Sequence, residues 1–123
     1  MFLFLESLVN ELRKEFSVRT FNIEPQMVIT SIELFPADYD YSSQTLRSDV
    51  AYVIDYRKLR KYDPHVSLAP LICVIHRDSE PDPVFFRKRP VALVTCRSTE
   101  ELLAELSNLL YFYGGRSSTF AAM

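Results

Sequence analysis

Three short apolar runs, at residues 50–54, 71–75 and 91–95, constrain the fold of this chain more than any other feature. The runs are essentially continuous, whereas a strand with one solvated face alternates apolar and polar side chains. They are therefore typical of strands that are covered on both faces. Connections of about 15 residues separate them, and parallel pairing needs crossovers of such a length. The pattern predicts an α/β fold with a small, mostly parallel sheet.

The segment that follows the third run carries the clearest helix signal. Ser98 with Glu101 three residues later fits a capping box, in which the two side chains satisfy backbone N–H groups of the first turn. Apolar side chains then recur at helical spacing: Leu102, Leu103, Leu106, Leu109, Leu110 and Tyr113. Gly114 suits the position after the helix end. We expect an amphipathic C-terminal helix on the sheet. Its stretch 109–113 is apolar around more than one helix face. A contact with another chain, as in a homodimer, or with a further domain is therefore expected as much as intramolecular packing.

The N-terminal part predicts a second amphipathic helix and up to two more strands. Within residues 2–16 the apolar side chains fall on one helical face: Leu5, Leu8, Val9, Leu12 and Phe16. Residues 18–23 and 27–35 fit strands, with Pro25 between them and Pro36 at the end. Residues 37–48 predict a loop. We therefore expect a sheet of three to five strands, with an N-terminal and a C-terminal amphipathic helix packed on it.

The connection between the last two apolar runs is harder to assign. Residues 76–90 contain three prolines, which disfavour a helix in the interior of this segment. Residues 84–86 fit either an irregular loop or a small antiparallel strand.

Length and charge limit the domain organisation and the partners. The 123 residues suit one α/β domain at 1–115, followed by a loosely ordered tail at 116–123. Truncation from a longer protein at this tail would explain why the C-terminal helix carries more apolar surface than one sheet face can cover. A net charge of −2 gives no electrostatic case for nucleic acid or an anionic membrane as the main partner. The apolar N-terminus has no basic segment and is interrupted by Glu6, so it does not fit a signal peptide. A cytoplasmic location without a membrane partner is expected.

Glycine content excludes two nucleotide-binding motifs. Gly114 and Gly115 are the only glycines in the chain. A phosphate-cradling loop needs glycine where the backbone approaches phosphate or adopts a positive φ. A P-loop and a dinucleotide-binding fingerprint are therefore excluded, and no cofactor is expected. No metal site is expected either, because Cys73 and His76 lie three residues apart on a predicted strand and point to opposite faces.

Cys96 is the candidate nucleophile. It ends the third apolar run just before a predicted helix, where the helix dipole and Arg97 are two influences that act to lower the pKa of a thiol. A nucleophile also needs a base and oxyanion donors within reach, and no motif places His65 or His76 beside it. A packed free thiol in a reducing compartment is favoured, so no catalytic residue is expected.

Ligands of parallel α/β sheets tend to bind beyond the carboxyl ends of the strands. The polar side chains that follow the predicted strands form the candidate ligand site: Asp55, Tyr56, His76, Arg77, Arg97, Ser98 and Thr99. The start of the C-terminal helix adds backbone N–H groups that favour a carboxylate or a phosphate. An ordinary helix cap satisfied by Ser98 is the alternative. The basic clusters at 57–61 and 87–89 are flanked by acidic residues, so solvated loop charge is favoured over direct nucleic-acid contact.

The order of these elements resembles a known family. An amphipathic helix precedes MVITSIELF, a loop, the strand DVAYVID, the strands LICVI and VALVT, and the helix STEELLAELSNLLYFY. This order is similar to the N-terminal region of bacterial transcriptional regulators of the purine-catabolism-regulator (PucR) type. In that family a variable sensory segment precedes a C-terminal helix-turn-helix domain, and the present sequence contains no helix-turn-helix.

The resemblance implies a non-enzymatic regulatory domain. Such a domain senses a small-molecule metabolite, dimerises, or does both, and so controls a DNA-binding domain outside this chain. The first alternative is an accessory domain of a larger enzyme, which delivers substrate or docks. The second is a stand-alone enzyme that uses Cys96.

Overall fold

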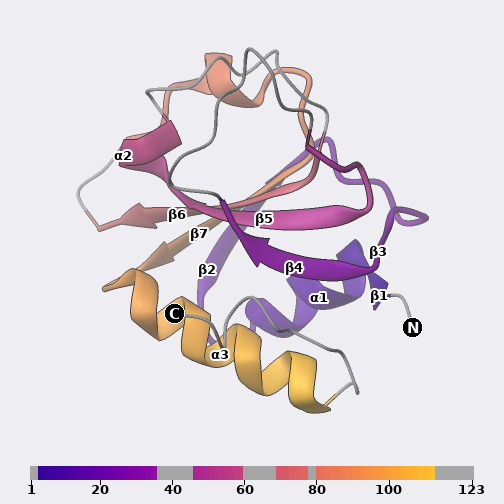
Figure 1. Ribbon diagram of the computed structural model, residues 1–123. Helices are drawn as coiled ribbons and strands as arrows, with labels where there is room; N and C mark the ends of the chain where they lie inside the picture. Colours follow the sequence, from indigo (N-terminus) through magenta and orange to yellow (C-terminus); the bar gives the residue numbers. More distant parts are fainter. Residues whose placement is uncertain (1–2, 36–45, 60–68, 78–79, 113–123) are drawn as a thin grey trace.

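The computed structural model describes residues 3–35, 46–59, 69–77 and 80–112, which form an α/β fold around one main sheet (Figure 1). This sheet has five strands in the order β2-β7-β6-β5-β4. Their bounds are Ser17–Phe21 for β2, Ser31–Leu34 for β4, Val50–Asp55 for β5, Leu71–His76 for β6 and Val91–Cys96 for β7. Strands β4 to β7 are parallel, and β2 pairs antiparallel with β7 at one edge. The α/β class and the mostly parallel sheet are confirmed.

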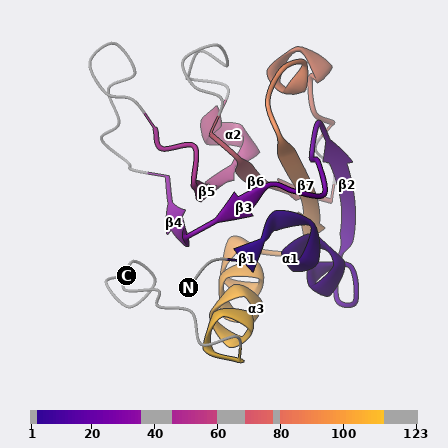
Figure 2. The same cartoon turned by 90° about the vertical axis from the view of Figure 1, so that its right-hand side faces the viewer.

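Helices lie on both sides of this sheet. The described residues form α1 (Leu5–Leu12), α2 (Tyr56–Leu59), α3 (Thr99–Phe112) and a short 3-10 helix, η1 (Pro83–Phe86). Figures 1 and 2 agree that α1 and α3 lie on one side of the sheet, with α2 and η1 on the other. Both faces of the central strands are therefore covered.

Two separate cores explain why the three sheet-forming runs are continuously apolar. On β6, Ile72 and Val74 face α1 and α3, whereas Leu71, Cys73 and Ile75 face the opposite side. The first core is called the helix-side core, and its buried helical members are Leu5, Leu8, Leu12, Leu102, Leu103 and Leu106. The second is called the loop-side core, and its buried members outside the strands are Tyr56, Ala69 and Phe86. Alternate side chains of each strand are thus removed from water on opposite faces.

The prediction of a helix over residues 2–16 is too long at both ends. Leu3 and Phe4 form β1, which pairs antiparallel with β3 (Val28–Ile29) in a separate two-stranded sheet. The N–H of Leu5 donates to the carbonyl of Met27 at 2.9 Å. Cross-strand bonds therefore hold the backbone extended up to the first helical residue. The helix ends at Leu12. Phe16 lies beyond the helix end and still packs against the helix-side core.

The predicted strand at 27–35 is interrupted at Thr30. Its N–H donates to the carbonyl of Asp49 at 2.7 Å, and its hydroxyl donates to the Asp49 carboxylate at 2.9 Å. The backbone therefore leaves β3 and enters β4, where Ser31 is the register partner of Val50. The Asp49 carboxylate also pairs with Arg47 at 2.6 Å, which fixes the approach to β5. The hydrogen bonds from Arg47 and Thr30 hold the pKa of Asp49 below its usual value.

Residues 84–86 are not a strand. They belong to η1, because Pro83 begins the turn with a fixed φ and the carboxylate of Asp82 accepts a hydrogen bond from the N–H of Val84 at 3.0 Å. This short helix covers the loop-side core with Phe86, which is 2% exposed.

Asn22, directly after β2, forms hydrogen bonds with η1 and the residues that follow it. It has a φ of 59°, a left-handed conformation that asparagine adopts more readily than most residues. From there its side-chain amide donates to the carbonyls of Phe86 at 2.8 Å and Arg89 at 3.0 Å. The bonds join positions more than 60 residues apart in the sequence.

Some predictions lie outside the described residues. They concern most of the loop at 37–48, the tail at 116–123 and the helix stop at Gly114. The side chains of residues 110–112 are also outside them, so a dimer contact through the end of α3 stays a prediction. In the part of the chain that the structure describes, no helix is both long and apolar enough to cross a lipid bilayer.

Candidate functional site

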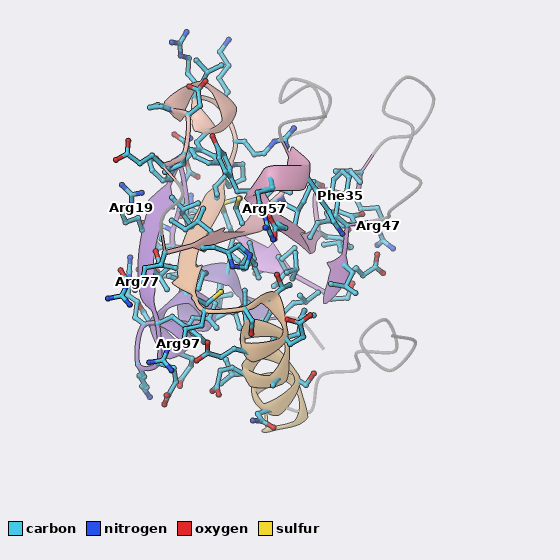
Figure 3. All side chains as sticks on the ribbon, turned by 90° about the vertical axis from the view of Figure 1, so that its left-hand side faces the viewer. Arg19, Phe35, Arg47, Arg57, Arg77 and Arg97 are labelled. Atoms are coloured by element: carbon cyan, nitrogen blue, oxygen red, sulfur yellow. The ribbon has the colours of Figure 1, made fainter. Side chains whose placement is uncertain are left out.

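The carboxyl ends of β5, β6 and β7 meet at one edge of the sheet, which faces the viewer in Figure 3 and is called the carboxyl edge. His76 is the register partner of Cys96, and Asp55 is the register partner of Val74. Register partners point to the same face, and so do residues two apart on a strand. Asp55, His76 and Cys96 therefore end three neighbouring strands on the face of the helix-side core.

Asp55 joins two of the side chains at this edge in one hydrogen-bonded network. Its Oδ1 accepts bonds from the backbone N–H of Arg57 at 2.8 Å and from Arg57 Nε at 3.1 Å. Its Oδ2 lies 2.9 Å from Arg57 Nη2 and 3.0 Å from His76 Nε2. The Asp55 side chain is only 10% exposed, whereas Arg57 is 69% and His76 26% exposed. A nearly buried carboxylate thus orients two more exposed donors.

The network keeps Asp55 ionised. Partial burial by itself raises the pKa of this carboxyl group. The hydrogen bonds from the side chain and backbone of Arg57 and from His76 outweigh burial and hold the pKa well below its usual range. The same bond to Asp55 raises the pKa of Arg57. The pair therefore stays charged at neutral pH.

Replacing Asp55 by asparagine is expected to lower the free energy of unfolding at pH 7 by about 1–2 kcal/mol, a value reduced by solvent screening at the exposed Arg57. Because the folded-state pKa of Asp55 is depressed, its contribution is complete above the unfolded pKa near 3.8 and is lost as pH falls through the folded value. Urea unfolding, followed by circular dichroism between pH 2 and pH 7, measures both effects. The gap between wild type and Asp55→Asn is expected to narrow below about pH 4.

Glu15→Gln is the matched control, since Glu15 is an exposed carboxylate outside the carboxyl edge. Its stability is expected to stay within about 0.5 kcal/mol of wild type at pH 7. A gap between wild type and Asp55→Asn that stays constant down to pH 2 would show that the Asp55 charge does not stabilise the fold.

Tyr56 does not join this network. It is 5% exposed and belongs to the loop-side core, where its ring lies 6.3 Å from that of Phe86. Its hydroxyl accepts a hydrogen bond from the N–H of Asp82. The start of α2 turns Tyr56 to the face opposite Asp55, so its contacts are with the core and the η1 loop.

The start of α3 is a satisfied helix cap. The hydroxyl of Ser98 accepts a hydrogen bond from the N–H of Glu101 at 3.2 Å, as the capping box predicts. The Glu101 carboxylate reaches the N–H of Arg97 at 3.3 Å, one residue before the expected partner. Thr99 begins the helix and is half-buried. Ser98 and Thr99 are accounted for by helix geometry, whereas Arg77 and Arg97 have exposed side chains.

Cys96 does not have the lowered pKa that a nucleophilic thiol needs. Cys96 is 6% exposed, and burial, followed by the charges of Glu101 and Asp55, raises the pKa of its thiol to about 11. Among the described residues no hydrogen bond joins this thiol to His76, although the two are register partners. Helix dipole and Arg97 do not compensate for the loss of hydration. The thiol is therefore protonated at neutral pH.

Cys73 lies on the other face from His76, as the strand alternation predicts. It is fully buried in the loop-side core, and burial raises the pKa of its thiol far above the usual value. Within the described ranges, no group of three or more His, Cys, Asp or Glu side chains is arranged to hold a metal ion.

Arg57 is the functional candidate that sequence reasoning missed. Its place in a run of basic residues predicts a solvated cluster, yet it makes three hydrogen bonds with Asp55. The spacing Asp55-Tyr56-Arg57 directly after a buried strand is the signal that points to it, because a carboxylate at a strand end readily caps the N–H two residues later.

Comparison with known proteins adds no family assignment: a scan with protein-family models and searches of curated proteins and of solved structures found no match.

Proposed function

We propose that this chain is a non-enzymatic regulatory domain that binds a small-molecule metabolite at the carboxyl edge of its sheet. The resemblance to PucR-type regulators supports a role in a cytoplasmic bacterial transcription regulator, with the DNA-binding domain outside this chain. Ligand binding shifts the population between two arrangements of the regulator and so sets its activity. DNA contact by this domain is not part of the proposal.

The network of Asp55, Arg57 and His76 is the observation that carries this proposal. It gathers a fixed carboxylate, a guanidinium and an imidazole where parallel α/β sheets tend to bind ligands. Asp55 accepts hydrogen bonds from two side-chain nitrogens of Arg57, so this side chain is already ordered before a ligand binds. The entropic cost of ordering it on binding is therefore smaller. Within the described ranges, no hydrogen bond reaches Nη1 of Arg57 or the second ring nitrogen of His76.

Proton chemistry supports binding over catalysis. The Cys96 thiol, with a pKa of about 11, supplies almost no thiolate at neutral pH. Asp55 is held as a carboxylate by its partners, which makes it a weak general base. The carboxyl edge therefore suits recognition of a molecule better than its chemical conversion.

A docking or dimerisation role is the second candidate, and a pair of apolar side chains favours it. Phe4 and Val28 are register partners on β1 and β3, and they are 46% and 39% exposed. Large apolar side chains side by side at a surface often mark a contact with another protein. An accessory domain of an enzyme would use such a surface.

A thermal-shift screen of the whole chain against purines, amino acids, sugar acids and short diacids tests the proposed function. A ligand that binds only the native state raises the melting temperature in a dose-dependent way. At a concentration one hundred times its Kd, such a ligand raises the free energy of unfolding by about 2.7 kcal/mol. We expect one chemical class to do so. Arg57→Gln and Asp55→Asn are expected to reduce the shift, whereas Cys96→Ser and Arg19→Gln leave it unchanged.

Two results would contradict the regulatory proposal. The absence of a shift with every class, together with a dimer mass in light scattering, would favour the docking role. A shift that Cys96→Ser abolishes, accompanied by turnover of the compound, would favour an enzyme.

A further inference from the structure

Three neighbouring strands of the sheet each lead into an arginine at the carboxyl edge. Arg57 follows β5, Arg77 follows β6 and Arg97 follows β7. Figure 3 shows Arg77 and Arg97 on the side of β2 and β7, with Arg57 beside α2. Since His76 and Cys96 are register partners, Arg77 and Arg97 come directly after a paired position on adjacent strands. These last two residues are called the arginine pair.

Neither guanidinium group of the arginine pair is ion-paired within the ranges that the structure describes. Both side chains are exposed, and no described residue forms an ion pair or a hydrogen bond with either guanidinium group. Asp55 already accepts bonds from Arg57 and His76. Glu101 bonds the backbone N–H of Arg97 instead of its side chain. Two neighbouring like charges repel each other, and a bound anion relieves that repulsion.

We infer that the arginine pair binds the oxyanion group, a carboxylate or a phosphate, of the small molecule sensed at the carboxyl edge. The inference rests on the proposed function and gives its ligand a chemical class. A planar guanidinium group donates two parallel N–H bonds to such an oxyanion, which makes arginine well suited to it.

Three other arginines differ from this pair in their partners or in their place in the fold. Arg47 is neutralised by Asp49 at 2.6 Å. Arg13 bonds the side chain of Asn10 at 3.2 Å. Arg19 is exposed like the pair, but it lies within β2 opposite Leu93, away from the carboxyl ends of the parallel strands. Arg19 therefore provides a matched control with the same charge at a different place.

Titration of the isotope-labelled chain at low ionic strength, followed by backbone amide NMR, tests the inference. The probes are inorganic phosphate, succinate and the uncharged analogue succinamide. We expect the anions to shift amide signals at residues 76–77 and 96–99, and succinamide to leave them unchanged. Arg77→Gln and Arg97→Gln are each expected to weaken binding about fivefold, and the double variant to weaken it more than either single variant. Arg19→Gln is expected to change the Kd less than about twofold. The anion with the lower Kd assigns the group as carboxylate or phosphate.

Three outcomes would overturn the inference alone. The first is binding of succinamide as tight as that of succinate. The second is an unchanged Kd in the double variant, with an unchanged melting temperature showing that it is folded. The third is the finding of a neutral ligand whose binding requires Asp55 and Arg57 but not the arginine pair. That result would leave the proposed regulatory role intact. Absence of binding by every class of compound overturns the inference together with the proposed function.

Discussion

Replacing Phe86 by alanine is expected to lower the free energy of unfolding by about 3–5 kcal/mol, the usual range for a buried aromatic side chain. Phe86 is 2% exposed in the loop-side core. Its ring stacks on that of Phe21 with centroids 5.2 Å apart and lies 6.3 Å from that of Tyr56. Truncation removes both contacts and leaves a cavity that the surrounding strands fill only in part. Urea unfolding followed by circular dichroism measures the loss, which is large because a domain has only about 5–15 kcal/mol in total.

Val84→Ala is the matched control in the same short helix. Val84 is 48% exposed, so its truncation is expected to change the free energy of unfolding by less than about 0.5 kcal/mol. If Phe86→Ala cost less than about 1 kcal/mol, η1 would not cover this side of the sheet as the structure shows.

Replacing Leu106 by alanine is expected to cost about 2–5 kcal/mol on the opposite side of the sheet. Leu106 is 0% exposed and lies in the helix-side core, which also contains Leu12 of α1 and Val94 of β7. The loss combines the transfer of the missing carbon atoms to water with the cavity left between two helices and the sheet. The same unfolding experiment measures it, and the slope of the transition should stay unchanged if only native packing is altered.

Asn108→Ala controls for changes in the helix itself. Asn108 is exposed on α3, and alanine has the higher helix propensity, so stability is expected to stay equal or to rise slightly. Similar small effects of Leu106→Ala and Asn108→Ala would contradict the docking of α3 on the sheet.

Much of the fold could be predicted because burial follows short-range periodicity. Continuous apolar runs identified β5, β6 and β7, and helical spacing identified Leu106 as a core residue. Predictions were less accurate where the signal is long-range. Leu3 and Phe4 have helix-like neighbours, yet pairing with β3 makes them a strand. Phe86 lies between prolines without any period, and its burial depends on Phe21 and Asn22 far away in the sequence.

The candidate site was predictable in outline and not in detail. Parallel strands bring Asp55, His76 and Arg97 to one edge, as their positions after apolar runs indicated. Whether a side chain at a strand end joins the edge or the core depends on the turn that follows. At the end of β5 that turn directs Arg57 to Asp55 and directs Tyr56 into the loop-side core.

The sequence by itself determined the α/β class, the covered strands and the two amphipathic helices, because strand alternation and helical spacing are set by neighbouring residues. It also determined that no P-loop forms, since the only glycines are Gly114 and Gly115. The tertiary structure alone decided the chemistry of the edge. The ionised state of Asp55 and the protonated thiol of Cys96 depend on solvent exposure and on partners from other strands. Register and burial set both, and neither is a local property of the chain.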